Sequence, residues 1–163
     1  MIEFSEGSLF DSGAAALVNP VNVVGVMGKG LALEFSKRFP KASADYRAAC
    51  ADGRMKLGQV FAAEEGGVTI LHFPTKQHWR NPSKLEYIME GLHSLVETLR
   101  SRGIASVAVP PLGCGCGGLD WARVRPLIVS ALDRLPEVQV LIYGPAIERS
   151  SQGIRHIDSC LTR

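Results

Sequence analysis

Short apolar runs alternate with longer amphipathic segments along most of the chain. The apolar runs have the length of strands, and we expect strands over residues 2–6, 15–19, 59–63, 68–73, 105–109 and 138–143. The amphipathic segments carry apolar residues at spacings of three and four, and we expect helices over 31–39, 42–51, 83–102 and 121–132. Apolar strands that alternate with helices are typical of a parallel sheet covered on both faces. The pattern therefore predicts an α/β fold in three layers (α/β/α), with a mixed, mostly parallel sheet of about six strands flanked by helices.

Two local signals refine this pattern. Gly66-Gly67 joins two of the expected strands as a hairpin, which adds an antiparallel pair to the sheet. Ser83 is followed three residues later by Glu86, which predicts a capping box at the start of the third helix, and Gly103 marks that helix's end.

Composition and length indicate a single globular domain. The chain has 163 residues, of which 46% are hydrophobic and 21% charged, with a net charge of +2. No apolar run reaches the roughly 18 residues needed to span a membrane, and the N-terminus lacks a signal-peptide pattern. We therefore expect a cytoplasmic protein with no membrane partner, a monomer, and cysteines that are reduced thiols. The domain should occupy residues 1–145, and the weakly patterned residues 146–163 should form a C-terminal tail.

Glycines cluster in two loops, each between an expected strand and an expected helix. The first loop is Gly25-Val26-Met27-Gly28-Lys29-Gly30-Leu31, and the second is Pro111-Leu112-Gly113-Cys114-Gly115-Cys116-Gly117-Gly118-Leu119. Glycines there allow backbone N–H groups to converge on an anion beside a helix N-terminus. The spacing fits neither a dinucleotide fingerprint nor a P-loop. Tight turns explain one such loop equally well, but two in one small domain favour a phosphate or diphosphate ligand.

Polar residues at strand ends supply candidate chemistry. Asn19 and Asn22 flank Pro20-Val21, where asparagine either caps a turn or binds a sugar hydroxyl. Lys76 follows a buried strand and is either a solvated loop charge or a nucleophile or phosphate partner. Cys114 and Cys116 are either nucleophiles or small residues that a glycine loop tolerates. The four histidines have no metal-ligand spacing, so we expect no metal and no cofactor.

Taken together, these motifs resemble the macrodomain family, the ADP-ribose-binding fold. The resemblance rests on Val18-Asn19-Pro20-Val21-Asn22 with the first glycine loop, on Thr75-Lys76, on the second glycine loop with Trp121, and on Tyr143. It covers about residues 1–145. The subclass that the chain most resembles contains terminal ADP-ribose protein glycohydrolase and the DNA ADP-ribosyl glycohydrolase antitoxins.

The resemblance implies a role for each matching position. Asn19 and Asn22 would approach the distal ribose, and Tyr143 would pack near the adenine. Lys76 would act against the anomeric carbon of the distal ribose, with Asn22 as the second catalytic residue. The diphosphate would be clamped by the two loops, with the binding positions Gly25, Val26, Met27, Gly28, Lys29, Gly30, Leu31, Pro111, Gly113, Cys114, Gly115, Cys116, Gly117, Gly118 and Leu119.

The chain departs from the subclass in two places. Gly7-Ser8 replaces the Gly-Asp pair whose aspartate contacts adenine. Gly117 stands where some members carry a catalytic aspartate, and Asp120 lies three residues later. Antitoxin-type members match this loop better, but they normally carry a second, toxin-neutralising domain for which 163 residues leave no space. The sequence does not decide whether a toxin partner exists.

Three functions follow from the resemblance. The first is a hydrolase that removes ADP-ribose from ester-linked protein Glu or Asp side chains or from ADP-ribosylated DNA. The second is a non-catalytic module that reads ADP-ribose. The third is a phosphatase acting on ADP-ribose 1″-phosphate. Lys76 favours catalysis over reading, whereas the missing loop aspartate favours reading.

Overall fold

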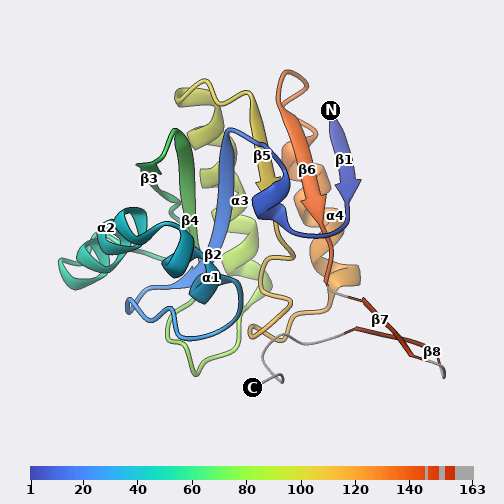
Figure 1. The fold of residues 1–163 in the computed structure, drawn as a ribbon, viewed down its shortest axis with the longest axis horizontal. Helices are drawn as coiled ribbons and strands as arrows, with labels where there is room; N and C mark the ends of the chain where they lie inside the picture. Colours follow the sequence, from blue (N-terminus) through green and yellow to red (C-terminus); the bar gives the residue numbers. More distant parts are fainter. Residues whose placement is uncertain (146, 151–152, 157–163) are drawn as a thin grey trace.

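The computed structural model describes residues 1–145, 147–150 and 153–156, and its main part has three layers (Figure 1). The strands of the central sheet are β1 (Ile2–Ser5), β2 (Ala16–Asn22), β3 (Phe61–Glu65), β4 (Val68–Lys76), β5 (Ser106–Val109) and β6 (Gln139–Tyr143). The helices are α1 (Gly30–Arg38), α2 (Pro40–Ala51), α3 (Leu85–Ser101) and α4 (Trp121–Leu132), with a short 3-10 turn, η1, at Leu9–Asp11. Within the described residues no helix is long and apolar enough to cross a membrane.

The sheet has the strand order β1-β6-β5-β2-β4-β3. Neighbouring strands are parallel except for β3, which pairs antiparallel with β4 as a hairpin. The predicted α/β fold with a mixed, mostly parallel sheet is thus confirmed. Because β2, β4 and β5 are parallel neighbours, their carboxyl ends meet at one edge of the sheet, where ligands bind in open α/β folds.

Each face of the sheet carries its own hydrophobic core. Alternate residues of β2 separate the two cores: Ala16 and Val18 pack with α3 and α4, whereas Leu17 packs with α1 and α2 (Figure 1). The α3 stripe that the spacing predicts is buried as expected, with Ile88 and Leu95 fully inaccessible.

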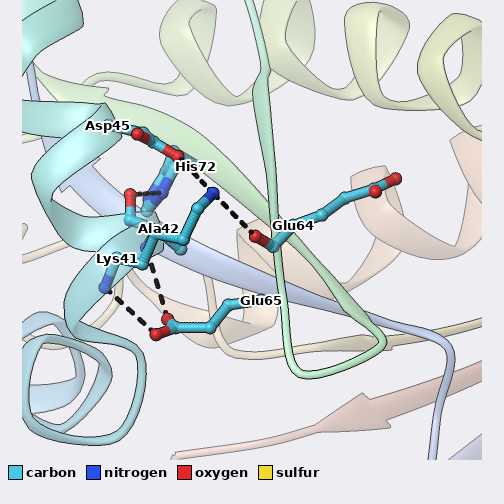
Figure 2. Close-up of polar contacts among 6 residues, drawn as sticks. All are labelled: Lys41, Ala42, Asp45, Glu64, Glu65 and His72. Carbon is cyan, nitrogen blue, oxygen red and sulfur yellow. Dashed lines mark hydrogen bonds and ion pairs between the residues drawn. The ribbon is translucent and has the colours of Figure 1, made fainter.

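Helix α2 is fixed to the β3–β4 hairpin through its first turn (Figure 2). The Glu65 carboxylate accepts hydrogen bonds from the backbone N–H groups of Lys41 and Ala42, at 3.1 and 3.3 Å. These N–H groups have no partner inside the helix, and a negative charge is favourable at this end. Lys41 Nζ adds bonds to Asp45 and to the Glu64 carbonyl oxygen, both at 3.4 Å. The contacts set the position of α2 on the sheet.

Several local expectations differ from the structure. Strand β4 continues to Lys76, although the pattern ended it at residue 73, and the strand expected over 59–63 lies at Phe61–Glu65. The prediction of a capping box at Ser83 was wrong, since α3 begins at Leu85 without a side-chain cap. Ser83 is instead buried, and its N–H donates to the Gly117 carbonyl oxygen at 3.0 Å. Strand β2 continues through Pro20 to Asn22, although the pattern ended it at Asn19. Within the expected tail, residues 147–150 and 153–156 pair as a two-stranded antiparallel sheet, β7–β8; the rest of 146–163 lies outside the described residues.

Candidate functional site

A cleft of about 530 Å³ opens at the carboxyl ends of β2, β4 and β5. Both glycine loops contribute to its walls. It is lined by Pro20, Val21, Asn22, Val26, Gly28, Lys29, Gly30, Leu31, Ala32, Thr75, Lys76, Trp79, Arg80, Pro110, Pro111, Gly113, Gly115, Cys116 and Gly117. A smaller groove of about 350 Å³ lies on the far side of α3 and α4 and shares none of these residues.

The two predicted catalytic residues are neighbours across the ends of two strands. Asn22 of β2 pairs with Lys76 of β4 in the sheet register, directly after an irregularity between Val21 and Asn22. Both side chains are nearly buried, with 7% of Asn22 and 9% of Lys76 exposed. Their proximity follows from strands β2 and β4 lying side by side and ending together.

The side chain of Asn22 organises the first glycine loop. Its Oδ1 accepts from the N–H groups of Val24 and Val26 at 3.1 and 3.3 Å, and its Nδ2 donates to the Val26 carbonyl oxygen at 2.8 Å. The buried Tyr46 hydroxyl of α2 donates to the Asn22 carbonyl oxygen at 2.7 Å and lies 3.0 Å from Oδ1. Burial raises the pKa of Tyr46, so this hydroxyl stays a donor. One N–H of the Asn22 amide is left to reach a ligand.

The ammonium group of Lys76 connects β4 to the second glycine loop. Its Nζ donates to the carbonyl oxygen of Cys116 at 2.6 Å and to that of Trp79 at 3.4 Å. Lys29 and Arg80 also line the cleft, and no Asp or Glu is among the lining residues. The cleft is therefore electrostatically suited to an anion.

The first loop leads directly into a helix N-terminus. Helix α1 begins at Gly30 with Lys29 as its N-cap and no side-chain cap, so its first N–H groups are open to a ligand in the cleft. Gly30 has φ of 56°, a conformation that glycine adopts without strain. A Cβ at Gly28 would meet only Val26, at 3.9 Å.

The second loop is packed too closely for a side chain at one position. A Cβ on Gly117 would overlap Ser83 Oγ and the Gly113 carbonyl oxygen. Gly113 has φ of 73° and accepts a backbone hydrogen bond from Leu119 at 2.9 Å. Glycine at these two positions is required by the loop itself.

Several predicted binding residues lie outside the cleft lining. These are Asn19, Gly25, Met27, Cys114, Gly118, Leu119 and Tyr143. Met27 is buried in the core beneath the first loop, and Tyr143 is 7% exposed in the same core. Their contacts with a ligand stay predictions.

Asn19 belongs to a buried polar chain. His72 Nε2 lies 3.1 Å from the Ala42 carbonyl oxygen, which makes this nitrogen the donor (Figure 2). On the other side of the ring, Asn19 Nδ2 lies 3.2 Å from His72 Nδ1. Burial lowers the pKa of His72 to about 4, so the ring is neutral at pH 7. Asn19 is fully buried, and its Oδ1 has no hydrogen-bond partner among the described residues.

Neither cysteine of the second loop offers a thiolate. Burial raises the pKa of the Cys114 thiol to about 12, which keeps it protonated and weakly nucleophilic at pH 7. Cys116 is disulfide-bonded, contrary to our expectation of reduced thiols. That expectation rested on the cellular compartment, and the spacing excluded only a bond between Cys114 and Cys116.

Asp120, which lies near the departure at Gly117, and Ser8, which belongs to the other departure, both have structural roles here. The Asp120 carboxylate caps α4 by accepting from the Ala122 N–H at 3.0 Å, and Asp120 does not line the cleft. The Ser8 hydroxyl caps η1. In the described part of the chain, no group of three or more His, Cys, Asp or Glu side chains is arranged to hold a metal ion, and the absence of a metal stays a prediction.

Trp79 and Arg80 were missed as site residues by the sequence analysis. Both lie on the segment between β4 and α3 and line the cleft. Their signal was present: an aromatic and a cationic residue stand three and four positions after the candidate lysine, in His78-Trp79-Arg80. Tyr46 was missed as well, because its place in an apolar helix stripe reveals nothing of its hydroxyl.

Comparison with known proteins defines the class. The Macro domain family model matches residues 18–128, and the chain therefore belongs to the macrodomain family. Over 150 residues it is 49% identical to the DNA ADP-ribosyl glycohydrolase of Mycobacterium tuberculosis, covering 90% of this chain and 43% of the relative. The chain thus spans less than half the length of this relative.

Solved structures agree with the class and with the described fold. The macrodomain of Mycobacterium tuberculosis DarG matches with a TM-score of 0.88 at 49% identity, covering 90% of this chain and 99% of that one. The Thermosipho africanus DarTG in complex with ADP-ribose matches with a TM-score of 0.83 at 37% identity, covering 91% of this chain and 43% of that one. The resemblance to macrodomains that the motifs indicated is confirmed.

Proposed function

We propose that this macrodomain binds ADP-ribose in the cleft and hydrolyses its bond to a modified macromolecule. The observation that carries the proposal is Lys76 beside Asn22 at the end of a cleft walled by two glycine loops and free of lining carboxylates. The Mycobacterium tuberculosis relative is named a DNA ADP-ribosyl glycohydrolase. This name supports ADP-ribosylated DNA, over ester-linked protein, as the proposed substrate of this chain.

Each wall of the cleft has a proposed role in binding or in the reaction. The backbone N–H groups of the first loop and of the α1 N-terminus would hold the diphosphate, with Lys29 adding charge. Asn22, fixed by Tyr46, would use its remaining amide hydrogen toward the distal ribose. Lys76 has two roles open to it at C1″. Its neutral amine could form a bond to C1″ as the bond to the leaving group breaks, and water would then hydrolyse this lysine adduct to free the amine. Alternatively, its ammonium could give a proton to the leaving group while water forms the new bond to C1″.

A reader module without turnover is the second candidate. It is favoured by the cleft lining, which holds no carboxylate that could act as a general base among the described residues. A phosphatase acting on ADP-ribose 1″-phosphate would use the same subsites, and nothing in the site favours it specifically.

A side-by-side turnover assay separates the candidates. The substrates are an ADP-ribosylated DNA oligonucleotide, a carboxylate-linked ADP-ribosyl protein and ADP-ribose 1″-phosphate. We expect release of ADP-ribose from the DNA and calorimetric binding of free ADP-ribose. Binding without turnover of any substrate would establish the reader, whereas no binding at all would refute the assignment of the cleft.

The proposed partners follow from the same relatives. A 39% identical protein of Thermosipho africanus is named a DNA ADP-ribosyl transferase-DNA ADP-ribosyl glycohydrolase fusion protein, matched over 88% of this chain and 42% of its own length. We infer that a DNA ADP-ribosyl transferase supplies the substrate of this macrodomain. A cytoplasmic location and a monomeric state belong to this proposal too.

A further inference from the structure

An exposed aromatic and cationic surface borders the cleft on the segment after β4. Trp79 is 45% exposed although it is a large hydrophobic side chain. The His78 ring stacks with it at a centroid distance of 5.2 Å, and the Arg80 guanidinium lies over its ring at 4.5 Å. We call these three residues the aromatic rim. Exposed flat groups of this kind are the usual platform on which unpaired nucleobases stack.

The aromatic rim lies at the end of the cleft where the reaction would occur. Lys76 Nζ donates to the Trp79 carbonyl oxygen at 3.4 Å, so the rim and the candidate catalytic amine are directly connected. If Lys76 acts at C1″, the group attached to C1″ lies near Lys76 and therefore near the Trp79 residue that Lys76 contacts. The diphosphate subsites of the first loop do not need the aromatic rim.

The charge of the surroundings selects an anionic chain. The residues from Lys76 to Lys84 include three cationic side chains, Lys76, Arg80 and Lys84, and no Asp or Glu. Lys29 lies on the opposite wall, and no carboxylate lines the cleft. A phosphodiester strand gains from such a field, whereas a protein segment rich in Glu or Asp side chains would make no use of the flat rings.

We propose that the aromatic rim binds single-stranded DNA, with a base next to the ADP-ribosylated nucleotide stacked on Trp79 and a phosphate contacted by Arg80. This inference rests on the proposed function and names the part of the substrate that the ADP-ribose subsites do not read. Stacking requires an unpaired base, so the rim also predicts preference for single-stranded over duplex substrate.

The test compares two substrates of the full chain: an ADP-ribosylated oligonucleotide of several nucleotides and the same ADP-ribosylated nucleoside without flanking nucleotides. Trp79→Ala should lower kcat/KM for the oligonucleotide about tenfold, because one base–aromatic stack is lost. Trp79 also lines the cleft, so some loss is expected for the nucleoside as well. That loss should be clearly smaller, so the ratio of kcat/KM for the oligonucleotide to kcat/KM for the nucleoside should fall severalfold. Arg80→Ala should lower the slope of log affinity against log salt by about 0.7 for one phosphate contact.

Phe4 with Arg125 provides a matched control. Phe4 is 49% exposed and has the Arg125 guanidinium over its ring at 4.1 Å, but it lies on the outer strand β1 and does not line the cleft. Phe4→Ala should leave both substrates unchanged.

The outcomes separate the two levels of inference. If the wild-type protein releases ADP-ribose from both substrates and Trp79→Ala affects them equally, the aromatic rim does not bind DNA and the proposed function stands. Turnover of carboxylate-linked ADP-ribosyl protein but not of either DNA substrate would also overturn the inference. Absence of turnover on every substrate would instead refute the proposed function.

Discussion

The two glycine loops reach the same cleft but are held in different ways. The first loop depends on polar side chains: Asn22 bonds Val24 and Val26, and Tyr46 holds Asn22. The second depends more on close packing: Gly117 lies against Ser83 and Gly113 where no side chain fits, and Lys76 adds a side-chain bond from outside this loop to the Cys116 carbonyl oxygen. Substitutions should therefore act on the first loop through affinity and on the second through stability.

We expect the largest effect from substitution of Lys76, the candidate catalytic residue. Lys76 belongs to neither loop, but its Nζ donates to the Cys116 carbonyl oxygen of the second loop. Lys76→Ala should lower turnover at least about a thousandfold if the amine acts chemically, and leave ADP-ribose affinity within a few-fold. Parallel kinetics and calorimetry would measure both. A role as a tether of Cys116 or as a counter-charge would instead reduce affinity first.

Lys76→Arg separates these roles further. Arginine keeps the charge and a donor for the Cys116 carbonyl oxygen, but it has no amine that can lose its proton. A nucleophilic lysine would not tolerate this change. Full turnover by Lys76→Ala on every substrate would show that the catalytic assignment is wrong.

Substitutions at Gly28 and Gly117 test the two loops separately, the first through ligand affinity and the second through stability. Gly28→Glu has space for its side chain and places a negative charge at the proposed diphosphate site, so affinity should fall about a hundredfold with an unchanged melting temperature. Gly117→Ala should lower the free energy of unfolding by about 1–3 kcal/mol, because its Cβ overlaps Ser83 and Gly113.

Calorimetry and thermal melts of both variants decide the matter. Near-normal affinity in a folded Gly28→Glu variant would refute the diphosphate assignment of the first loop. A Gly117→Ala variant as stable as the wild type would show that the second loop adjusts easily.

Tyr46→Phe is the corresponding test of polar support in the first loop. It removes the hydroxyl that holds Asn22 and leaves the buried ring in place. We expect ADP-ribose affinity to fall about fivefold, which corresponds to the roughly 1 kcal/mol of one hydrogen bond. Tyr87→Phe, whose ring lies outside the cleft lining, is the control. Equal affinity of both variants would mean that the first loop holds its shape without Tyr46.

The sequence predicted the layers and the place of the cleft, but not which side chains reach it. Apolar periodicity is a property of neighbouring residues and was enough to locate the sheet strands. Asn19 and Asn22 were given the same role, yet one is buried against His72 and the other borders the cleft. The irregularity between Val21 and Asn22 changes which face of the sheet the next side chain points to, and no sequence pattern predicted it.

Long-range contacts explain the other misses. The local spacing of Ser83 and Glu86 predicted a helix cap. In the structure the Ser83 backbone N–H donates to the carbonyl oxygen of Gly117, a residue of the second loop that lies far away in the sequence. The Tyr46 hydroxyl and the Trp79 ring depend in the same way on which loops lie beside them. Lys76 and Asn22, which the resemblance had named as the catalytic residues, lie together because the parallel strands β2 and β4 end side by side.

Substitution of Asp120 should have the smallest effect, a small loss of stability without the loss of turnover expected for Lys76→Ala. Asp120 is the only Asp or Glu in the sequence from Pro111 to Trp121, and its side chain caps α4 instead of lining the cleft. Asp120→Ala should cost about 1 kcal/mol of stability, a melting shift of about 3 °C, because the Ala122 N–H loses its partner. Asp120→Asn, which can still cap, should restore the stability. Turnover should be unchanged in both variants, since the carboxylate takes no part in the chemistry. If Asp120→Ala and Asp120→Asn are both folded and both inactive, the Asp120 carboxylate itself enters the reaction and Lys76 does not act alone.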